Sequence, residues 1–293
     1  MIRLPGMLKV FTVLTVDFLS VYALFHDEAA AAAVVILIGL YVWLGGYFEL
    51  FKEGAVRDDK LPSYERSRLE NAKNQLVSDV RNTSSANISR LKVYLVPGDY
   101  SMQATAYSGR CVSVSRGTFD NTDPLTLNSV LAHEIAHALN FDPDFNRAVF
   151  ATILIICLAI SMVSFALTAV IFLFFCVCSF FRSWLGVMFF RGTTKTAGSI
   201  FQLIQKGVVV FFRGIISFWS RAAEFRADRY SAKLGYGIQL AHFLSYAAPE
   251  TDRRLTFSEA LYRTHPSTSK RIARLEKLIT KETHLVKEER ESY

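Results

Sequence analysis

One stretch of the sequence, residues 123–140, reads DPLTLNSVLAHEIAHALN and carries the strongest signal in the chain. Asp123 is a favoured N-cap residue, and Pro124 suits the first position of a helix. Apolar side chains then recur at helical spacing, namely Leu127, Val130, Leu131 and Leu139. The pattern predicts a helix that runs from this cap to about Asn140.

His133, Glu134 and His137 form an H-E-x-x-H pattern inside this helix. Because four residues advance a helix by about one turn, the two histidines project from the same face. Two imidazoles so placed can bind one zinc ion, and Glu134 can act as general base on a water that the zinc activates. The alternative is a chance match, which the independent helix signals oppose.

A catalytic zinc ion needs a third protein ligand, and Glu224 is the candidate. Glu224 and Asp228 lie four residues apart, on one face of a predicted helix. Asp228 could then orient a ligating histidine from behind. Spacing alone gives equal weight to the alternative that both are solvated charges beside Arg221 and Arg229, just outside a membrane.

The composition indicates a membrane protein. Hydrophobic residues make up 51% of the 293 residues and charged residues 20%, whereas a soluble domain usually carries about 25% charged residues. Together with 24 Phe, this excludes a disordered chain and argues against an ordinary soluble enzyme. The net charge of +7 then reflects cytoplasmic flanks rather than nucleic-acid binding. The four cysteines form no C-x-x-C pair, so neither a disulfide framework nor a cysteine zinc site is expected.

Two apolar runs near the N-terminus predict a transmembrane hairpin. Ala29–Phe48 carries no charge and is long enough to span the hydrocarbon core. Val10–Phe25 contains Asp17, which costs about 2.5–3.5 kcal/mol at mid-membrane, and a cleaved signal peptide is its alternative. Basic residues before and after the pair predict that both ends face the cytoplasm.

Two further apolar regions follow the H-E-x-x-H helix. Ala148–Phe181 is uncharged and, as one helix, would reach about 50 Å, so we expect a tilted span with an interfacial extension or part of a re-entrant hairpin. Ser199–Ser220 carries Lys206 and Arg213 and is either a weak fourth span or an amphipathic interfacial helix.

The polar region between these segments predicts a small α/β unit. Ser63–Arg81 has apolar residues on one helical face, and Leu91–Val96 is a strand that stops at a Pro-Gly pair. Two short strands are expected near Gln103–Tyr107 and Cys111–Ser115, and Thr118–Asp123 as a polar connection. Near the C-terminus, Ile272, Leu275, Leu278 and Ile279 form a helical stripe.

Three motifs in order carry a family resemblance: HEIAH at 133–137, EFRADRYSAKLG at 224–235 and THPSTSKRIARL at 264–275, with two apolar segments between the first two. This combination closely resembles the HtpX-like integral-membrane zinc metallopeptidases, a group related to the CAAX prenyl protease. The resemblance covers nearly the whole chain. It implies one zinc ion per chain held by His133, His137 and Glu224, with Glu134 as the catalytic glutamate.

The resemblance also implies roles for residues around the metal. Asp228 matches an acidic residue that supports a ligating histidine. His265 matches a histidine that stabilises the tetrahedral intermediate, with a buried structural histidine as its alternative. Arg271 is expected to be structural and to pair with an acidic group.

Two segments depart from the family pattern. The strand expected to line the substrate cleft starts Gln103-Ala104-Thr105-Ala106, where the family has N-A-F-A, so the substrate preference is in question. Asn140-Phe141-Asp142 replaces N-G-D, so the exit from the helix is expected to differ.

The expected fold is mainly α, an integral membrane protein of about four transmembrane helices with an α+β zincin-like metallopeptidase domain carrying a small sheet. Its four parts are residues 1–51, the hairpin; 52–147, with the H-E-x-x-H helix; 148–220, two membrane-embedded segments; and 221–293, with the third zinc ligand.

The expected activity is that of a zinc metalloendopeptidase in a bacterial plasma (inner) membrane, its site facing the cytoplasm. By resemblance its substrates are polypeptides, above all misfolded membrane proteins in stress-related quality control. We expect the protein to contact the lipid bilayer and not to bind nucleic acid. The sequence leaves the oligomeric state open. The alternatives are a narrow-specificity processing protease and a non-catalytic zinc-binding membrane adaptor or sensor.

Overall fold

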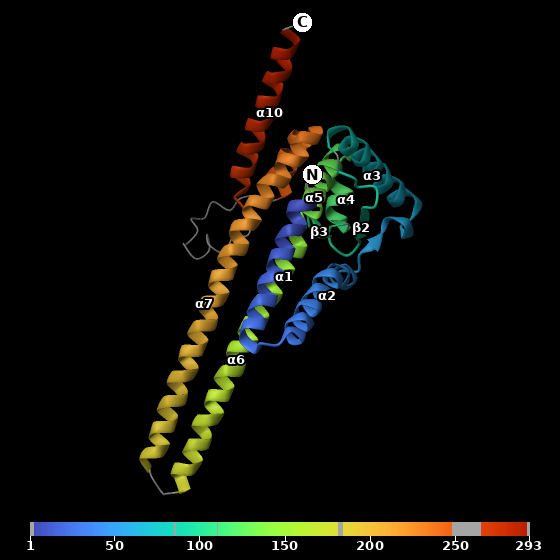
Figure 1. The fold of residues 1–293 in the computed structure, drawn as a ribbon. Coiled ribbons are helices and arrows are strands. Elements are labelled where there is room, and N and C mark those ends of the chain that lie inside the picture. The colour runs from blue at the N-terminus through green and yellow to red at the C-terminus, as the bar shows by residue number, and fades with distance from the viewer. Residues whose placement is uncertain (1–2, 85, 110, 181–183, 248–264, 292–293) are drawn as a thin grey trace. The chain divides into compact units, whose positions relative to one another are not determined.

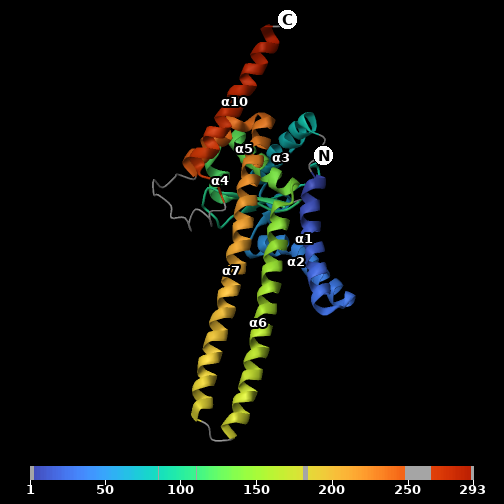
Figure 2. The same cartoon turned by 60° about the vertical axis from the view of Figure 1, so that its left-hand side comes forward.

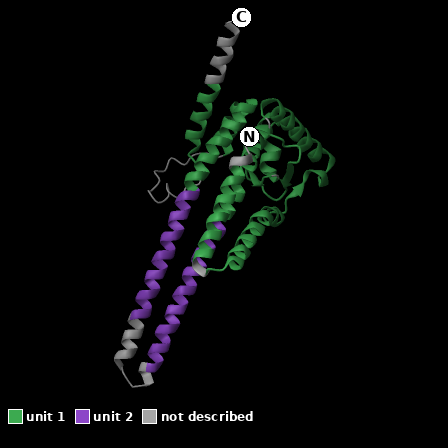
Figure 3. Cartoon of the chain, viewed as in Figure 1, with its two compact units in different colours: residues 1–148, 217–293 green, residues 149–216 purple. Residues whose placement is uncertain are grey.

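The computed structural model describes residues 3–84, 86–109, 111–180, 184–247 and 265–291. The chain divides into two compact units (Figure 3). Unit 1 combines residues 1–148 with 217–293, and unit 2 comprises residues 149–216. Segments from both ends of the chain therefore fold together in unit 1.

Unit 1 contains a four-stranded sheet in the order β1-β2-β4-β3. The strands are β1 (Val56–Arg57), β2 (Lys92–Val96), β3 (Ala104–Ser108) and β4 (Cys111–Ser115). β2 and β4 are parallel, whereas β1–β2 and β3–β4 are antiparallel, so β3 lies at an edge. The three expected strands are confirmed. β1 escaped prediction because two residues are too few to show an alternating pattern.

Helices α3 (Ser63–Thr83), α4 (Arg116–Asn121) and α5 (Pro124–Leu139) accompany this sheet. The buried face of α3 and the apolar face of α5 share one core with the strands; among its largest fully buried members are Leu69, Leu76, Val93, Leu127 and Leu131. The polar connection expected at Thr118–Asp123 is wrong in its first part, because α4 extends through Asn121. The Ser115 hydroxyl caps α4 by accepting from the Thr118 N–H at 3.1 Å.

The N-terminal hairpin consists of α1 (Arg3–Phe25) and α2 (Glu28–Lys52), which pack against each other. His26 at φ 51° makes the turn, and the Asp27 carboxylate caps α2 by accepting from the N–H groups of Ala29 and Ala30. Asp17 is only 6% exposed. Its burial in protein explains how an otherwise apolar segment accommodates a carboxylate.

Helices α6 (Asp142–Phe180) and α7 (Trp184–Ser231) pass from unit 1 into unit 2. Within unit 2 they run side by side (Figures 1 and 2). The Gln205 amide of α7 donates to the Ser161 hydroxyl at 2.7 Å and to the Cys157 carbonyl at 3.1 Å. One continuous helix covers Ala148–Phe181 as far as Phe180. Both alternatives for this region, a tilted span with an interfacial extension and part of a re-entrant hairpin, stay predictions.

Within the described residues, four helical segments are long and apolar enough to cross a membrane: Gly6–Ala23, Glu28–Lys52, Asp142–Val177 and Thr193–Ala247. Large apolar side chains on the last two are exposed, among them Leu158, Met162, Phe165, Leu203 and Phe211. Such surfaces require a non-aqueous partner, and the lipid bilayer supplies it. The expected fold class, a mainly α membrane protein with a small sheet, is confirmed.

The C-terminal part of unit 1 continues from α7. A π-helical turn at Ala232–Tyr236, with Gly235 at φ 89°, leads into α8 (Gly237–Ala247). Helix α10 (Thr268–Glu291) packs on α8 through a cluster that includes Leu240, Leu244, Ile272, Leu275 and Leu278. The predicted apolar stripe of this helix therefore faces the protein.

Candidate metal centre

Three side chains that could hold a metal ion converge in unit 1. His133 and His137 lie one turn apart on α5, and Glu224 comes from α7. Nε2 of His133 lies 3.2 Å from Nε2 of His137 and 3.4 Å from Oε2 of Glu224. Nε2 of His137 lies 3.6 Å from Oε1 of Glu224. The helix spacing brings the two imidazoles together, and the tertiary fold adds the carboxylate.

This arrangement fits a zinc ion. Ligands at about 2.0–2.1 Å from a tetrahedral zinc lie about 3.3–3.4 Å from one another. The 3.2, 3.4 and 3.6 Å between the donor atoms here lie within about 0.3 Å of that spacing. Two imidazoles and one carboxylate are also a ligand set found in catalytic zinc sites. His133, His137 and Glu224 would therefore hold the metal.

Each histidine has a carboxylate behind it. Nδ1 of His133 lies 3.1 Å from Oδ1 of Asp228, and Nδ1 of His137 lies 3.0 Å from Oδ2 of Asp142. A proton on each Nδ1 would face these carboxylates and leave the Nε2 lone pairs for a metal. Sequence reasoning proposed Asp228 for this role and missed Asp142, although Asp142 follows the second histidine by five residues.

The turn after α5 brings Asp142 to His137. Phe141 has φ 54°, a left-handed conformation that glycine adopts without steric cost. Its ring lies against Gly109, where an added Cβ would be 2.7 Å from Phe141 Cε1. Phe141 thus takes the backbone conformation that the glycine of the family's N-G-D segment would adopt. Its ring packs against Gly109.

Arg271 of α10 connects the acidic groups. Its Nη2 and Nε donate to Asp228 at 2.6 and 2.9 Å, and its Nη1 lies 2.9 Å from Oε2 of Glu224. Arg271 is 8% exposed, so these ion pairs lie in a desolvated environment. The expected pairing of Arg271 with an acidic group is present, and it involves two such groups at once.

The electrostatic environment favours a cation. Burial acts to lower the pKa of His133, but hydrogen bonding to Asp228 and Glu224 outweighs burial and raises that pKa. The carboxylates thus stabilise positive charge between the helices. A divalent metal ion would use the same negative potential.

Glu134 directly follows His133 on α5, and its side chain is partly exposed. Burial raises the pKa of Glu134, whereas the positive potential of His133 and His137 opposes this shift. A carboxyl group with a raised pKa is suited to accept and return a proton.

His265 reaches the centre from the segment before α10. Its Nδ1 lies 2.8 Å from Oε1 of Glu224, and this hydrogen bond raises the pKa of His265. Its side chain is 66% exposed, which does not fit the alternative of a buried structural histidine. In this arrangement His265 contacts a candidate metal ligand, and its expected role toward an intermediate stays a prediction.

Gln103 and Ala104 lie at the start of the edge strand. The Gln103 amide donates to Oδ2 of Asp99 at 2.5 Å, and its carbonyl accepts from the Ser115 N–H at 3.1 Å. Ala104 pairs with Val114 of β4. Gln103 therefore fixes the loop before β3, and neither side chain touches the candidate metal ligands in a contact that the structure defines.

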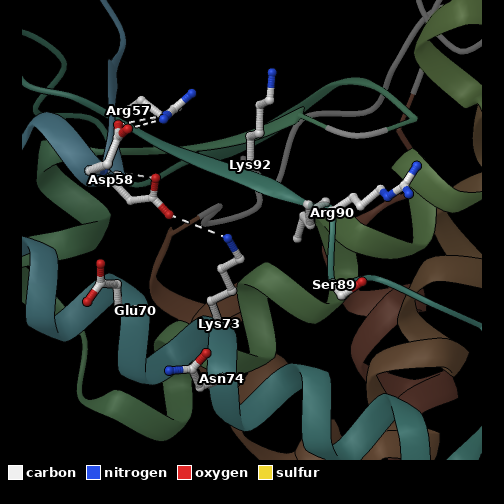
Figure 4. Close-up of a pocket in the computed structure, with 10 residues that line it drawn as sticks. Arg57, Asp58, Glu70, Lys73, Asn74, Ser89, Arg90 and Lys92 are labelled. Carbon is white, nitrogen blue, oxygen red and sulfur yellow. Dashed lines mark hydrogen bonds and ion pairs between the residues drawn. The ribbon is translucent and has the colours of Figure 1, made fainter.

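A separate open pocket of about 460 Å³ lies between α3 and the strands β1 and β2 (Figure 4). Lys73 points toward Asp58, with Nζ and Oδ2 3.6 Å apart, whereas the Arg90 and Lys92 side chains point away from this pair. Because its charges are mixed and partly neutralise one another, this pocket does not form a second candidate centre.

Comparison with known proteins agrees with the geometry. The model of peptidase family M48, a family of zinc metallopeptidases, matches residues 68–279, which include all three candidate ligands. The crystal structure of Ste24p from S. mikatae has a similar fold, with a TM-score of 0.50 and 16% sequence identity. The match covers 92% of this chain and 64% of that one, so the chain spans less than two thirds of that relative. No curated protein sequence matches. By the extent of the family match, the chain belongs to peptidase family M48.

Proposed function

We propose that the chain is a membrane-bound zinc-dependent endopeptidase. The observation that carries the proposal is the convergence of His133, His137 and Glu224, with Glu134 next to them on α5. Family membership supports the same reaction class. The roles of these individual residues are part of the proposal.

The chemistry follows from the residues around the centre. A bound zinc ion would supply Lewis-acid chemistry, by lowering the pKa of a water molecule and polarising the scissile carbonyl. Glu134 takes the proton from the attacking water and passes it to the leaving amine. Glu134 follows His133 directly on α5, which places the base beside the proposed ligands. No covalent intermediate with the protein is required.

We further propose that the polypeptide substrate lies along β3. This strand is at the sheet edge, where it pairs with β4 along one side and with no other described strand of the sheet along the other. An extended peptide can add to such an edge through backbone hydrogen bonds. Gln103 and Ala104 would then influence which residues fit, and His265 would stabilise the negative charge that develops on the carbonyl oxygen.

The proposed cellular task is quality control of misfolded membrane proteins, with the site facing the cytoplasm of a plasma (inner) membrane. Basic residues flank both ends of the hairpin, which supports this orientation. A processing protease with a narrow substrate range is the second candidate. A non-catalytic zinc-binding adaptor or sensor is the third, and the presence of Glu134 argues against it.

The test is a cleavage assay on the full chain in detergent. The protein is purified with a chelator, zinc is added back, and cleavage of the chain itself and of casein is followed beside Glu134→Gln. We expect zinc-dependent cleavage by the wild type and a loss of at least about 10²-fold in the variant. Zinc binding without cleavage in either sample would favour the narrow-substrate or sensor functions, and absence of zinc binding would refute the metal site.

A further inference from the structure

We propose that Lys9 of transmembrane helix α1 is a positioning residue for the metal centre, which acts through Asp142 on His137. This inference rests on the proposed zinc site, and the measurements below separate failure of one from failure of the other. It makes the N-terminal hairpin part of the scaffold that orients a metal ligand.

The contacts form a short chain from the membrane helix to the imidazole. Lys9 Nζ donates to Oδ1 of Asp142 at 2.8 Å, and Oδ2 of Asp142 lies 3.0 Å from Nδ1 of His137. Arg226 of α7 completes the arrangement, since its Nη2 lies 2.8 and 2.9 Å from the two carboxylate oxygens. Asp142 is therefore held by two cations while it faces the histidine.

Helix α1 is fitted closely to this corner of unit 1. A Cβ added at Gly6 would lie 2.4 Å from the Asn140 carbonyl oxygen, so the backbone of α1 directly contacts the end of α5. Lys9 follows Gly6 by three residues and lies on the same side of the helix. Its Nζ is also 5.4 Å from the centre of the Phe145 ring. The Lys9 side chain is thus fixed at the corner where α5 ends and α6 begins.

The Lys9–Asp142 ion pair is more buried than the Arg226–Asp142 ion pair. The side chains of Lys9 and Asp142 are 17% and 12% exposed, whereas that of Arg226 is 39% exposed. Lys9 also falls within the candidate span Gly6–Ala23, where a charge is costly unless it is paired. Loss of the Lys9 ammonium leaves Asp142 paired with the more exposed cation alone. We expect the carboxylate to shift toward Arg226 and the His137 ring to lose its fixed orientation.

The decisive measurements are the zinc dissociation constant and the visible absorption spectrum of the Co²⁺-loaded protein, both on the full chain in detergent. Lys9→Met should weaken zinc binding about tenfold, the lower end of the effect of removing groups behind metal ligands, and alter the Co²⁺ bands. Lys9→Arg should restore both. Lys52→Met, at the exposed end of α2, is the matched control and should change neither.

A double-substitution cycle tests the route of the effect. If Lys9 acts through Asp142, Lys9→Met should add nothing to the loss of affinity caused by Asp142→Asn. Additive losses would overturn the proposed route. If Lys9→Met does not yield a folded protein by gel filtration, Lys9→Gln takes its place in both measurements.

The outcomes distinguish the two proposals. Wild-type protein that binds no zinc would overturn the proposed function itself. Wild-type protein that binds zinc, beside a Lys9→Met variant with the same affinity and the same Co²⁺ spectrum, would overturn only the role of Lys9.

Discussion

Arg271 and Asp228 form a two-bonded ion pair, with Nη2 and Nε of the guanidinium 2.6 and 2.9 Å from the two carboxylate oxygens. The pair joins α10 to α7, and Asp228 in turn lies 3.1 Å from Nδ1 of His133. Helix α10 thus contacts the candidate metal centre, although it contributes none of the three candidate ligands. Asp228 lies beside Nδ1 of His133, and Asp142 lies beside Nδ1 of His137.

Replacing Arg271 with lysine should therefore weaken zinc binding. Lysine keeps the charge but loses the planar fork that holds Asp228 with two hydrogen bonds. We expect about a tenfold higher zinc dissociation constant, measured by competition with a chelator. Lys270→Ala, an exposed change on the same helix, should have no effect. Equal affinity of Arg271→Lys and the wild type would show that this pair does not orient the ligands.

Glu224→Gln should abolish tight zinc binding. A neutral amide is a poor zinc ligand, and the change removes the only anionic donor of the proposed set. Metal analysis after extensive dialysis should find one zinc ion per wild-type chain and far less in the variant. Stoichiometric zinc in the dialysed variant would exclude Glu224 as a ligand.

Gly46→Ala should destabilise the protein, whereas Gly39→Ala on the same helix should not. A Cβ at Gly46 would lie 2.6 Å from the Tyr107 carbonyl oxygen of β3, and a Cβ at Gly39 meets no atom within 4 Å. Forcing the helix off the strand should cost about 1–3 kcal/mol. Thermal unfolding in detergent, followed by tryptophan fluorescence, compares the two. A similar melting temperature for both variants would contradict the close packing of α2 on β3.

Asp123 should stabilise α5 in a pH-dependent manner. Hydrogen bonds from the Thr126 hydroxyl, and then from the backbone N–H groups of Thr126 and Leu125, lower the pKa of its carboxyl group. A lowered pKa in the folded state means that this stabilisation is present above about pH 4, the pKa of an unfolded aspartate, and is lost as the pH falls through the folded value.

The corresponding variants separate charge from capping. Asp123→Ala should lower stability by about 1 kcal/mol at pH 7 and by less at pH 3. Asn is as good a cap without a titrating group, so Asp123→Asn should retain most of the stability at both values of pH. A loss in Asp123→Ala that does not change with pH would show that the charge contributes nothing.

Residues 52–140 and 221–293 should be accessible from the same side of the membrane. His133 and Glu224 come from these two regions and meet in unit 1. Single cysteines in each region, labelled with a membrane-impermeant reagent in sealed vesicles, test the prediction. Labelling from opposite sides would refute a shared metal centre.

Local patterns in the sequence were sufficient for the elements that carry the site. The cap at Asp123 and the apolar periodicity predicted α5, and four-residue spacing placed His133 with His137 and Glu224 with Asp228. These predictions succeeded because the helical repeat fixes which side chains share a face. The two-residue strand β1 and the short helix α4 lack a repeat long enough to detect.

The sequence by itself thus determined the apolar helices and the helix that carries His133 and His137, since each depends on hydrophobicity or on spacing within one helix. The tertiary structure decided which groups surround the ligands. Lys9 meets Asp142 across 133 residues, and Arg271 meets Asp228 across 43. Such contacts depend on how whole helices pack, and packing geometry leaves no periodic trace in either segment of the sequence.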